Sequence, residues 1–258
     1  MKLTTLGCWG GYPYQDEGTT SYLLTGEDGF ELLIDAGSRS LNELEKEVSP
    51  LGLDAVIISH YHPDHVADLG VLRHYRQLYP KDKWTPRILP IYGHNRDTSE
   101  FSKLSLQGVS EGIAYNVDGT EKIGPFEITF IETVHPVICY AMRIKEVSTG
   151  QILVFTGDTG YFKELLPFVE GADLFLADVY LYEGMENHVA HLTSKEAGQI
   201  AREAGVKKLV LTHLPQFPGE GIAPENHLEV LRQQADVYSG QASVDLAQPH
   251  KSWDLGQL

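Results

Sequence analysis

The segment that follows the apolar run Ala55–Ile58 contains the densest group of possible metal ligands in the chain. His60, His62, Asp64 and His65 lie within six residues. If the segment is extended, alternate side chains share a face, so the first two histidines can point at one ion while the aspartate and the third histidine reach past it. Polar groups clustered at the end of a buried strand cost desolvation energy unless something pairs with them. We therefore expect a metal site here.

The residues around this group predict the elements that position it. The run Ala55–Ile58 has the length and the β-branched content of a buried strand. Pro63 stands where a helix could begin, and Val66, Leu69 and Leu72 continue at helical spacing. The local prediction is a strand, a ligand loop and a helix.

The pattern His60-x-His62-x-Asp64-His65 resembles the signature of the metallo-β-lactamase fold hydrolases. The resemblance implies three more ligands, and residues of the right type follow in the family's order. They are His135 after the apolar run 128–134, Asp158 in the segment 155–160, and His213 after the apolar run 208–212. The resemblance extends over residues 1–218. It also implies that Asp35, which follows the run 30–34, orients the ligand loop, although a simple turn at a strand end is the alternative.

The resemblance implies two divalent cations and divides the ligands between them. It assigns His60, His62 and His135 to one cation, Asp64, His65 and His213 to the other, and Asp158 to a bridging position. Nitrogen and oxygen ligands without a thiolate suit Zn²⁺ and also tolerate Mn²⁺ or Fe²⁺. Two such ions can hold a hydroxide between them for an in-line displacement. A related diiron redox group has a glutamate where His62 stands, so hydrolysis is favoured over electron transfer.

His191 is our candidate proton donor. Thr193 and Glu196 form a possible capping box, which predicts a helix that begins just after this histidine. The segment resembles the His-Ser/Thr motif of the ribonuclease Z branch, and by analogy His191 is a general acid or a phosphate contact. His188 is the rival candidate. Asp178 stands in place of the glutamate that orients this histidine in that branch, and we count Asp64 and Asp178 with His191 as catalytic residues.

Two observations argue against transfer RNA as the substrate. The segment between Ile144 and Thr156 has no Gly/Pro-rich basic arm of the kind that grips transfer RNA in the ribonuclease Z branch. The formal net charge is −16 and the twenty Lys and Arg residues look scattered, so a large nucleic-acid partner is disfavoured. We expect a small-molecule phosphodiester as substrate, such as a cyclic nucleotide. A thioester or lactone hydrolase of the same fold is the alternative, followed by a non-catalytic metal-binding module.

Length and patterning predict one domain over residues 1–258 with an α/β architecture. The predicted strands fall in two groups, each followed by helices, which fits a four-layer αββα sandwich with the ligands at the open edge between two sheets. The Gly-rich segment 7–13 is compatible with a ligand-approaching loop or with ordinary turns. We expect a helix over 99–107, and a tail over 239–258 that is loosely patterned and packs late or frays.

The remaining features concern location and partners. The two cysteines, Cys8 and Cys139, have no CxxC spacing, which suits a reducing compartment. The amino-terminal segment is too short and polar for a signal peptide, and no apolar run approaches the roughly 20 residues that span a bilayer. We expect a cytoplasmic protein with no membrane partner, and the sequence also allows a homodimer. A secreted β-lactamase is disfavoured.

Overall fold

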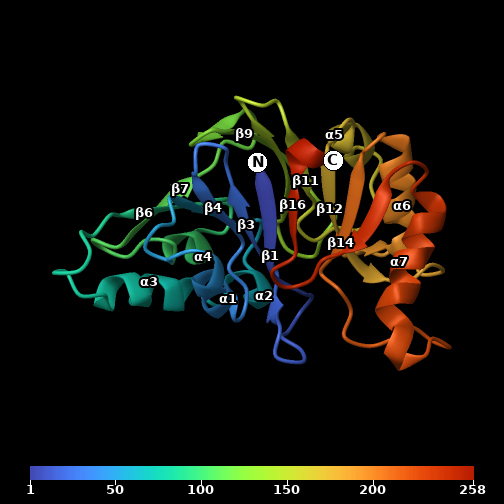
Figure 1. Ribbon diagram of the computed structural model, residues 1–258, viewed down its shortest axis with the longest axis horizontal. Coiled ribbons are helices and arrows are strands. Elements are labelled where there is room, and N and C mark those ends of the chain that lie inside the picture. Colours follow the sequence, from blue (N-terminus) through green and yellow to red (C-terminus); the bar gives the residue numbers. More distant parts are fainter.

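The computed structural model describes residues 1–258, and its strands form two sheets that face each other (Figure 1). The first sheet contains, in spatial order, β16 (Ser252–Asp254), β1 (Lys2–Trp9), β3 (Ser21–Thr25), β4 (Glu31–Ile34), β5 (Ala55–Ile57), β6 (Leu89–Gly93) and β7 (Ser110–Ala114), with β2 (Gly18–Thr19) paired to β1. The second contains β15 (Ser243–Leu246), β14 (Lys208–Thr212), β12 (Leu174–Leu181), β11 (Ile152–Phe155), β10 (Tyr140–Glu146), β9 (Phe126–Glu132) and β8 (Glu121–Ile123), with β13 (Leu192–Thr193) paired to β12.

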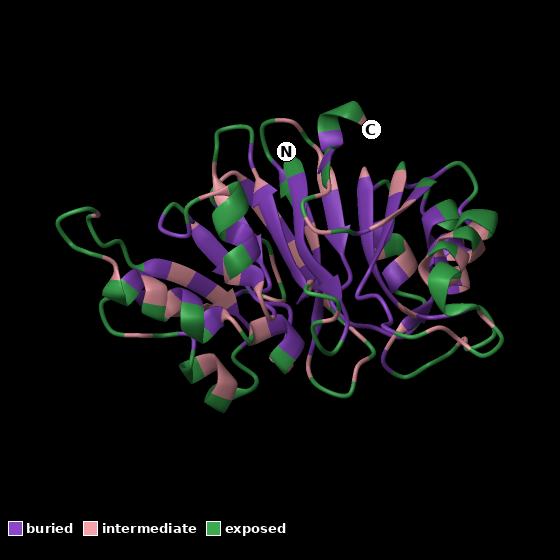
Figure 2. Cartoon of the chain, turned by 60° about the horizontal axis from the view of Figure 1, so that its bottom comes forward, coloured by how far each residue is buried: buried purple, intermediate pink, exposed green.

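The helices cover the outer faces of the two sheets. Beside the first sheet lie α1 (Ser40–Glu47), α2 (Pro63–Val66), α3 (Leu69–Leu78) and α4 (Thr98–Ser102). Beside the second lie α5 (Leu165–Val169), α6 (Ser194–Glu203) and α7 (His227–Tyr238). Short 3₁₀ turns occur at Pro224–Asn226 and Leu255–Gln257. Figure 2 shows buried strands inside and exposed helix faces outside, which confirms the predicted αββα sandwich.

The alternation of side chains along the strands explains the layers. Successive residues of a strand point to opposite faces of its sheet. Tyr22 and Leu24 of β3 belong to the large core that includes the interface between the sheets, whereas Leu23 between them packs in the smaller core with Leu44 of α1 and Leu72 of α3. Each central strand of the first sheet is therefore apolar on both faces and is buried by a sheet on one side and helices on the other.

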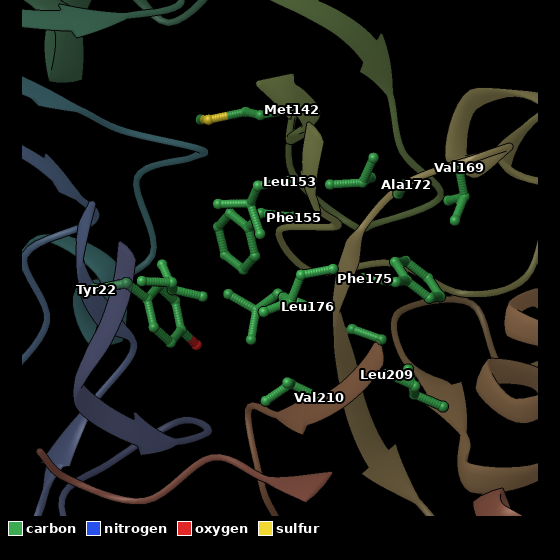
Figure 3. Packing of buried hydrophobic residues seen from close by; sticks show 14 of the residues in the cluster. Tyr22, Met142, Leu153, Phe155, Val169, Ala172, Phe175, Leu176, Leu209 and Val210 are labelled. Atoms are coloured by element: carbon green, nitrogen blue, oxygen red, sulfur yellow. The ribbon is translucent and has the colours of Figure 1, made fainter. Parts of the chain in front are cut away.

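Figure 3 shows the contact between the sheets from close by. Tyr22 of β3 points across the gap toward Phe155 of β11 and Leu176 of β12, and its ring lies 5.3 Å from that of Phe155 in an edge-on arrangement. Phe175 and Leu209 point the other way, toward the helices. The second sheet, like the first, is thus packed on both faces.

The helix expected over 99–107 is shorter than predicted. It begins after Asp97, whose carboxylate accepts a hydrogen bond from the Glu100 N–H, and it ends at Ser102. The chain then turns into β7, which the sequence did not predict because Gly112 and the polar residues beside it interrupt any apolar alternation.

The tail over 239–258 does not fray, contrary to one of the two alternatives that its loose patterning allowed. The tail forms β15, which pairs in parallel with β14 of the second sheet, and β16, which pairs antiparallel with β1 of the first. Trp253 of β16 is 6% exposed, and its indole N–H donates to Asp245 at 2.8 Å. The tail therefore completes both sheets.

Two further features are the connection between β10 and β11 and the length of the helices. Strands β10 and β11 are joined by the short turn at residues 147–151, within which Gly150 N–H donates to the Glu146 carbonyl. No helix in the structure is long and apolar enough to cross a bilayer.

We predict that Trp253→Ala lowers the free energy of unfolding by about 3–5 kcal/mol, because it leaves a cavity in the core and removes the bond to Asp245. Urea denaturation of the protein without added metal measures this change. Gln241→Ala, at an exposed position of the same tail, is the control and should change stability by less than about 0.5 kcal/mol. A loss for Trp253→Ala as small as that of the control would mean that the tail does not contribute to the core.

Candidate metal centre

The structure brings together all seven predicted ligands at one edge of the two sheets. The first four follow β5, and the others follow β9, β11 and β14, so both sheets contribute. Their ligand atoms form two groups, within each of which all atoms lie within 4.8 Å of one another. One group is His60, His62, His135 and Asp158, and the other is Asp64, His65, Asp158 and His213. Asp158 belongs to both, as the resemblance implied for a bridging residue.

The ligand loop has the predicted local structure, except that the helix expected after it is divided into α2 and α3. Strand β5 ends at Ile57, His62 occupies the N-cap position of α2, and Pro63 is the first helical residue. Proline is favoured there because its fixed φ suits the first turn and its missing N–H needs no partner. Asp64 and His65 consequently lie in the first turn of α2 and are both buried.

Asp35 locks this loop, in agreement with the role that the resemblance implied. One of its carboxylate oxygens accepts hydrogen bonds from the Ser59 hydroxyl and from His65 Nδ1, both at 2.7 Å, and the other accepts from the Ser59 N–H. With Nδ1 bound to Asp35, Nε2 is the nitrogen of His65 that faces Asp158, whose Oδ1 is 3.2 Å away. Such a partner fixes the tautomer and the ring orientation of a ligating histidine.

Backbone contacts orient two other ligands. His135 Nδ1 donates to the Ala190 carbonyl at 3.2 Å, which leaves Nε2 for the cluster. The Gly11 N–H donates to Asp64 Oδ2 at 2.7 Å. A β-carbon on Gly10 would lie 2.6 Å from the His213 ring, so only glycine allows this approach. The second half of the Gly-rich segment is therefore a loop that approaches the site, whereas Gly7–Trp9 belong to β1.

The three histidines of the first group are held neutral. Burial lowers the pKa of His60, and the neighbouring imidazole of His65 lowers it further. Burial also lowers the pKa values of His62 and His135. Because a metal binds only neutral imidazole, few protons compete for these three nitrogens.

The second group has the opposite electrostatics. Burial alone would lower the pKa of His65, but the carboxylates of Asp158 and Asp35 raise it to about 10. Burial opposes protonation of His213 too, yet Asp158 and Asp178 raise its pKa well above the usual value. Burial would raise the pKa of Asp158, but the imidazoles of His213 and His65 hold it well below its usual range. The carboxylates therefore require a positive charge here, either protons on the imidazoles or a cation.

Several buried atoms of the cluster fit a bound cation. His65 Nε2 and Asp158 Oδ1 are buried and lie 3.2 Å apart, but their geometry does not make a hydrogen bond and neither has another partner, although most buried polar atoms in proteins have one. Leaving such an atom unpaired costs about 1–3 kcal/mol. Imidazole nitrogens and carboxylate oxygens without a thiolate form a donor set for Zn²⁺, Mn²⁺ or Fe²⁺. The residues present thus fit divalent cations at this edge.

His191 and Asp178 adjoin this cluster. His191 Nδ1 donates to Asp178 Oδ2 at 2.9 Å, and the His191 ring stacks on that of His213 with 5.1 Å between centroids. Asp178 is fully buried and its other oxygen lies 3.3 Å from His213 Nδ1. The predicted capping box of Thr193 is present and begins α6. The aspartate therefore reaches His191 despite being shorter than a glutamate.

The other histidines lie outside the cluster. His188, the rival of His191, is exposed, and its Nδ1 accepts a hydrogen bond from the Ala190 N–H. His74 is on the surface beside Gln77, and His94 is buried against the ring of Tyr61. None of these three histidines hydrogen-bonds to a residue of the two groups, whereas His191 stacks on His213.

Tyr180 is a neighbour of the site that the sequence reasoning missed. Its ring lies 5.2 Å from that of His191 and 5.8 Å from that of His213. It follows Asp178 by two positions on β12, so both side chains project from the same face of the strand. That spacing is the signal that would have identified it.

Comparison with known proteins agrees with this geometry. Residues 31–214 match the family model described as "Beta-lactamase superfamily domain". A Bacillus subtilis protein named "Probable metallo-hydrolase YhfI" is 41% identical over 245 residues, which cover 95% of this chain and 96% of that protein. The crystal structure of YhfI, described as a metallo-beta-lactamase fold protein, matches with a TM-score of 0.89 at 40% identity and covers 98% of this chain and 99% of the other.

More distant relatives follow. Ribonuclease Z of Brevibacillus brevis is 28% identical over 247 aligned residues, covering 73% of this chain and 77% of that protein. A crystal structure described as a new diphosphatase from the PhnP family matches with a TM-score of 0.73 at 16% identity, covering 98% and 97% of the two chains, and it shares the fold. The matched residues, the close relative and the common architecture agree that the chain belongs to the metallo-β-lactamase superfamily.

Proposed function

We propose that this protein is a metal-dependent phosphodiesterase that acts on a small phosphodiester. The observation that carries the proposal is the His191–Asp178 pair beside the two ligand groups that share Asp158. A phosphodiester is an anion, and cleaving it requires positive charge at the phosphate and a proton for the leaving oxygen. This site offers a place for both.

The two ligand groups would hold two divalent cations, with Zn²⁺ as our first choice and Mn²⁺ or Fe²⁺ compatible. Bound cations would polarise the phosphate and lower the pKa of water. Asp35 keeps His65 in place, and the Gly11 N–H keeps Asp64 in place. The chain thus fixes the ligands before any substrate arrives.

His191 would move the proton. Its Nδ1 is bound to Asp178, so Nε2 is the nitrogen available to a substrate. In this arrangement the buried carboxylate orients the ring and stabilises the imidazolium, which donates its Nε2 proton to the leaving oxygen. Tyr180 packs against the ring and limits its rotation.

The names of the relatives and the charge of the chain bear on the substrate. A ribonuclease and a diphosphatase both act on bonds between phosphorus and oxygen, so the fold is compatible with that chemistry. The net charge of −16 and the short turn between β10 and β11 favour a small ester over a large nucleic acid. We keep hydrolysis of a thioester or lactone as the second candidate. The cytoplasmic location and a homodimer remain predictions.

A substrate panel tests the proposal. We expect the metal-loaded protein to hydrolyse bis(p-nitrophenyl) phosphate, and one or more cyclic nucleotides in a panel, while nitrocefin and an acyl thioester are left intact. Spectrophotometry and chromatography of the products measure this. Turnover of the thioester without turnover of any phosphodiester would establish the second candidate instead.

We predict that Asp158→Ala lowers metal content from about two equivalents to one or fewer, because both groups lose a shared ligand. Elemental analysis of the purified protein measures the change. Asp236→Ala, an exposed carboxylate on α7, is the matched control and should keep the metal content of the unchanged protein. Full retention of metal by Asp158→Ala would contradict the assignment of this residue.

We predict that His191→Ala lowers kcat by about 10²–10⁴-fold while metal content stays the same. The loss should be larger for an alkyl phosphodiester than for bis(p-nitrophenyl) phosphate, because p-nitrophenolate leaves readily without a proton. Steady-state kinetics on both substrates separate proton donation from a positioning role, which would lower both rates alike. His74→Ala, at an exposed histidine on α3, is the control and should retain activity on both.

A further inference from the structure

Positive charge is concentrated in one part of this acidic protein. Residues 73–87 contain five of its twenty Lys and Arg residues and a single acidic residue, so the cations are less scattered than the whole sequence suggests. The segment runs from the second half of α3 into the loop before β6. Figure 1 shows this loop at the left end of the molecule, away from α2, which carries two of the candidate ligands.

A small cavity lies within this basic segment. Its volume is about 220 Å³, and its walls include the cations Arg76, Lys81 and Arg87 together with Trp84 and Gln107. No carboxylate is among the lining residues. Pockets for drug-sized molecules have volumes of about 300–1,000 Å³, so this cavity suits a smaller ligand.

Arg76 provides a buried charge without an anionic partner. Arg76 is 3% exposed and forms no ion pair. Its guanidinium donates hydrogen bonds to the carbonyls of Pro50, Leu51 and Arg87 instead. Its Nε–H has no partner. The ring of Trp84 covers the guanidinium, with 5.0 Å between Cζ and the ring centroid. A buried charge normally has a counter-ion because desolvating it is costly.

The neighbouring cations are also largely uncompensated. Lys81 makes no ion pair, and the only one of Arg87 is to Asp54 at 3.5 Å. Burial lowers the pKa of Arg76 to about 10, and the nearby Arg87 adds to the shift. Phosphate is the anion that combines small size, high charge and several acceptor oxygens for Arg and Lys donors.

We infer that the cavity formed by Arg76, Lys81, Trp84 and Arg87 binds a phosphate group, either as inorganic phosphate or as the phosphomonoester end of a small molecule. The site is separate from the candidate metal centre, because none of the seven predicted ligands lines it. Lys81 and Arg87 would contact the anion from the rim. Arg76 would contribute its positive charge from the buried wall of the cavity, and its hydrogen bonds to the backbone carbonyls would stay in place.

Calorimetric titration of the metal-loaded protein tests this inference. Inorganic phosphate and AMP are titrated in separate arms, and Trp84 provides a fluorescence signal at the site. The test variant is Lys81→Ala/Arg87→Ala, which spares the structural Arg76. The control is Lys122→Ala/Lys163→Ala, which removes the same charge from two exposed lysines elsewhere. Asp158→Ala removes a ligand that both groups of the metal centre share. Anion binding that this variant loses is therefore binding at the metal centre.

We expect saturable binding that survives Asp158→Ala, weakens by about tenfold or more in Lys81→Ala/Arg87→Ala, and is unchanged in the control. Binding in both arms would identify the phosphate group alone as the ligand, and binding of AMP alone would identify a phosphomonoester. The inference is overturned if neither ligand binds at millimolar concentration, if both double variants weaken binding equally, or if Asp158→Ala alone abolishes it. Because phosphodiester turnover is not the readout, failure here is distinct from failure of the proposed activity.

Discussion

The buried carboxylate of Asp158 is the constraint on which the centre depends. It is 2% exposed and lies 3.6 Å from the nearest nitrogen of His60 and 3.2 Å from those of His65 and His213. A carboxylate in such surroundings needs a compensating positive charge, since desolvating it alone costs several kcal/mol. The segments that follow three other strands, β5, β9 and β14, supply its neighbours. Their convergence on one acid explains why both sheets must meet at this edge.

The backbone around the centre is strained where it presents these groups. Asp35 and His213 adopt φ angles of 56° and 52°, a left-handed region that is unfavourable for side chains with a β-carbon. Strain of this kind costs about 1–3 kcal/mol per residue and persists only where surrounding contacts enforce it. Asp35 is held by Ser59 and His65, and His213 directly follows the paired strand β14. The contacts of Asp35 and the pairing of β14 thus offset the backbone strain at these two residues and keep them oriented.

The sequence predicted those parts of the molecule whose signals are local. Strand β5, the ligand loop and the capping box of Thr193 depend on neighbours within a few residues, and each has the expected structure. The grouping around Asp158 came from the family resemblance, because no local pattern says which distant strands will adjoin. Strands β7 and β16 were missed, since a short strand with polar or glycine residues forms only where an existing sheet offers it an edge. Tyr180 was missed for the same reason, because its role arises from tertiary proximity, whereas the segment that contains Gly11 had been left open between a ligand-approaching loop and ordinary turns.

The place of β16 beside β1 has a consequence for how the protein is made. One edge of β1 pairs with β3, close behind it in sequence, but the other edge receives β16 only after residues 252–254 have been synthesised. Until then the nascent protein presents the unpaired N–H and C=O groups of a long strand, to which another chain can add. This edge of β1 is therefore covered only when β16 becomes available to pair with Lys2–Thr4.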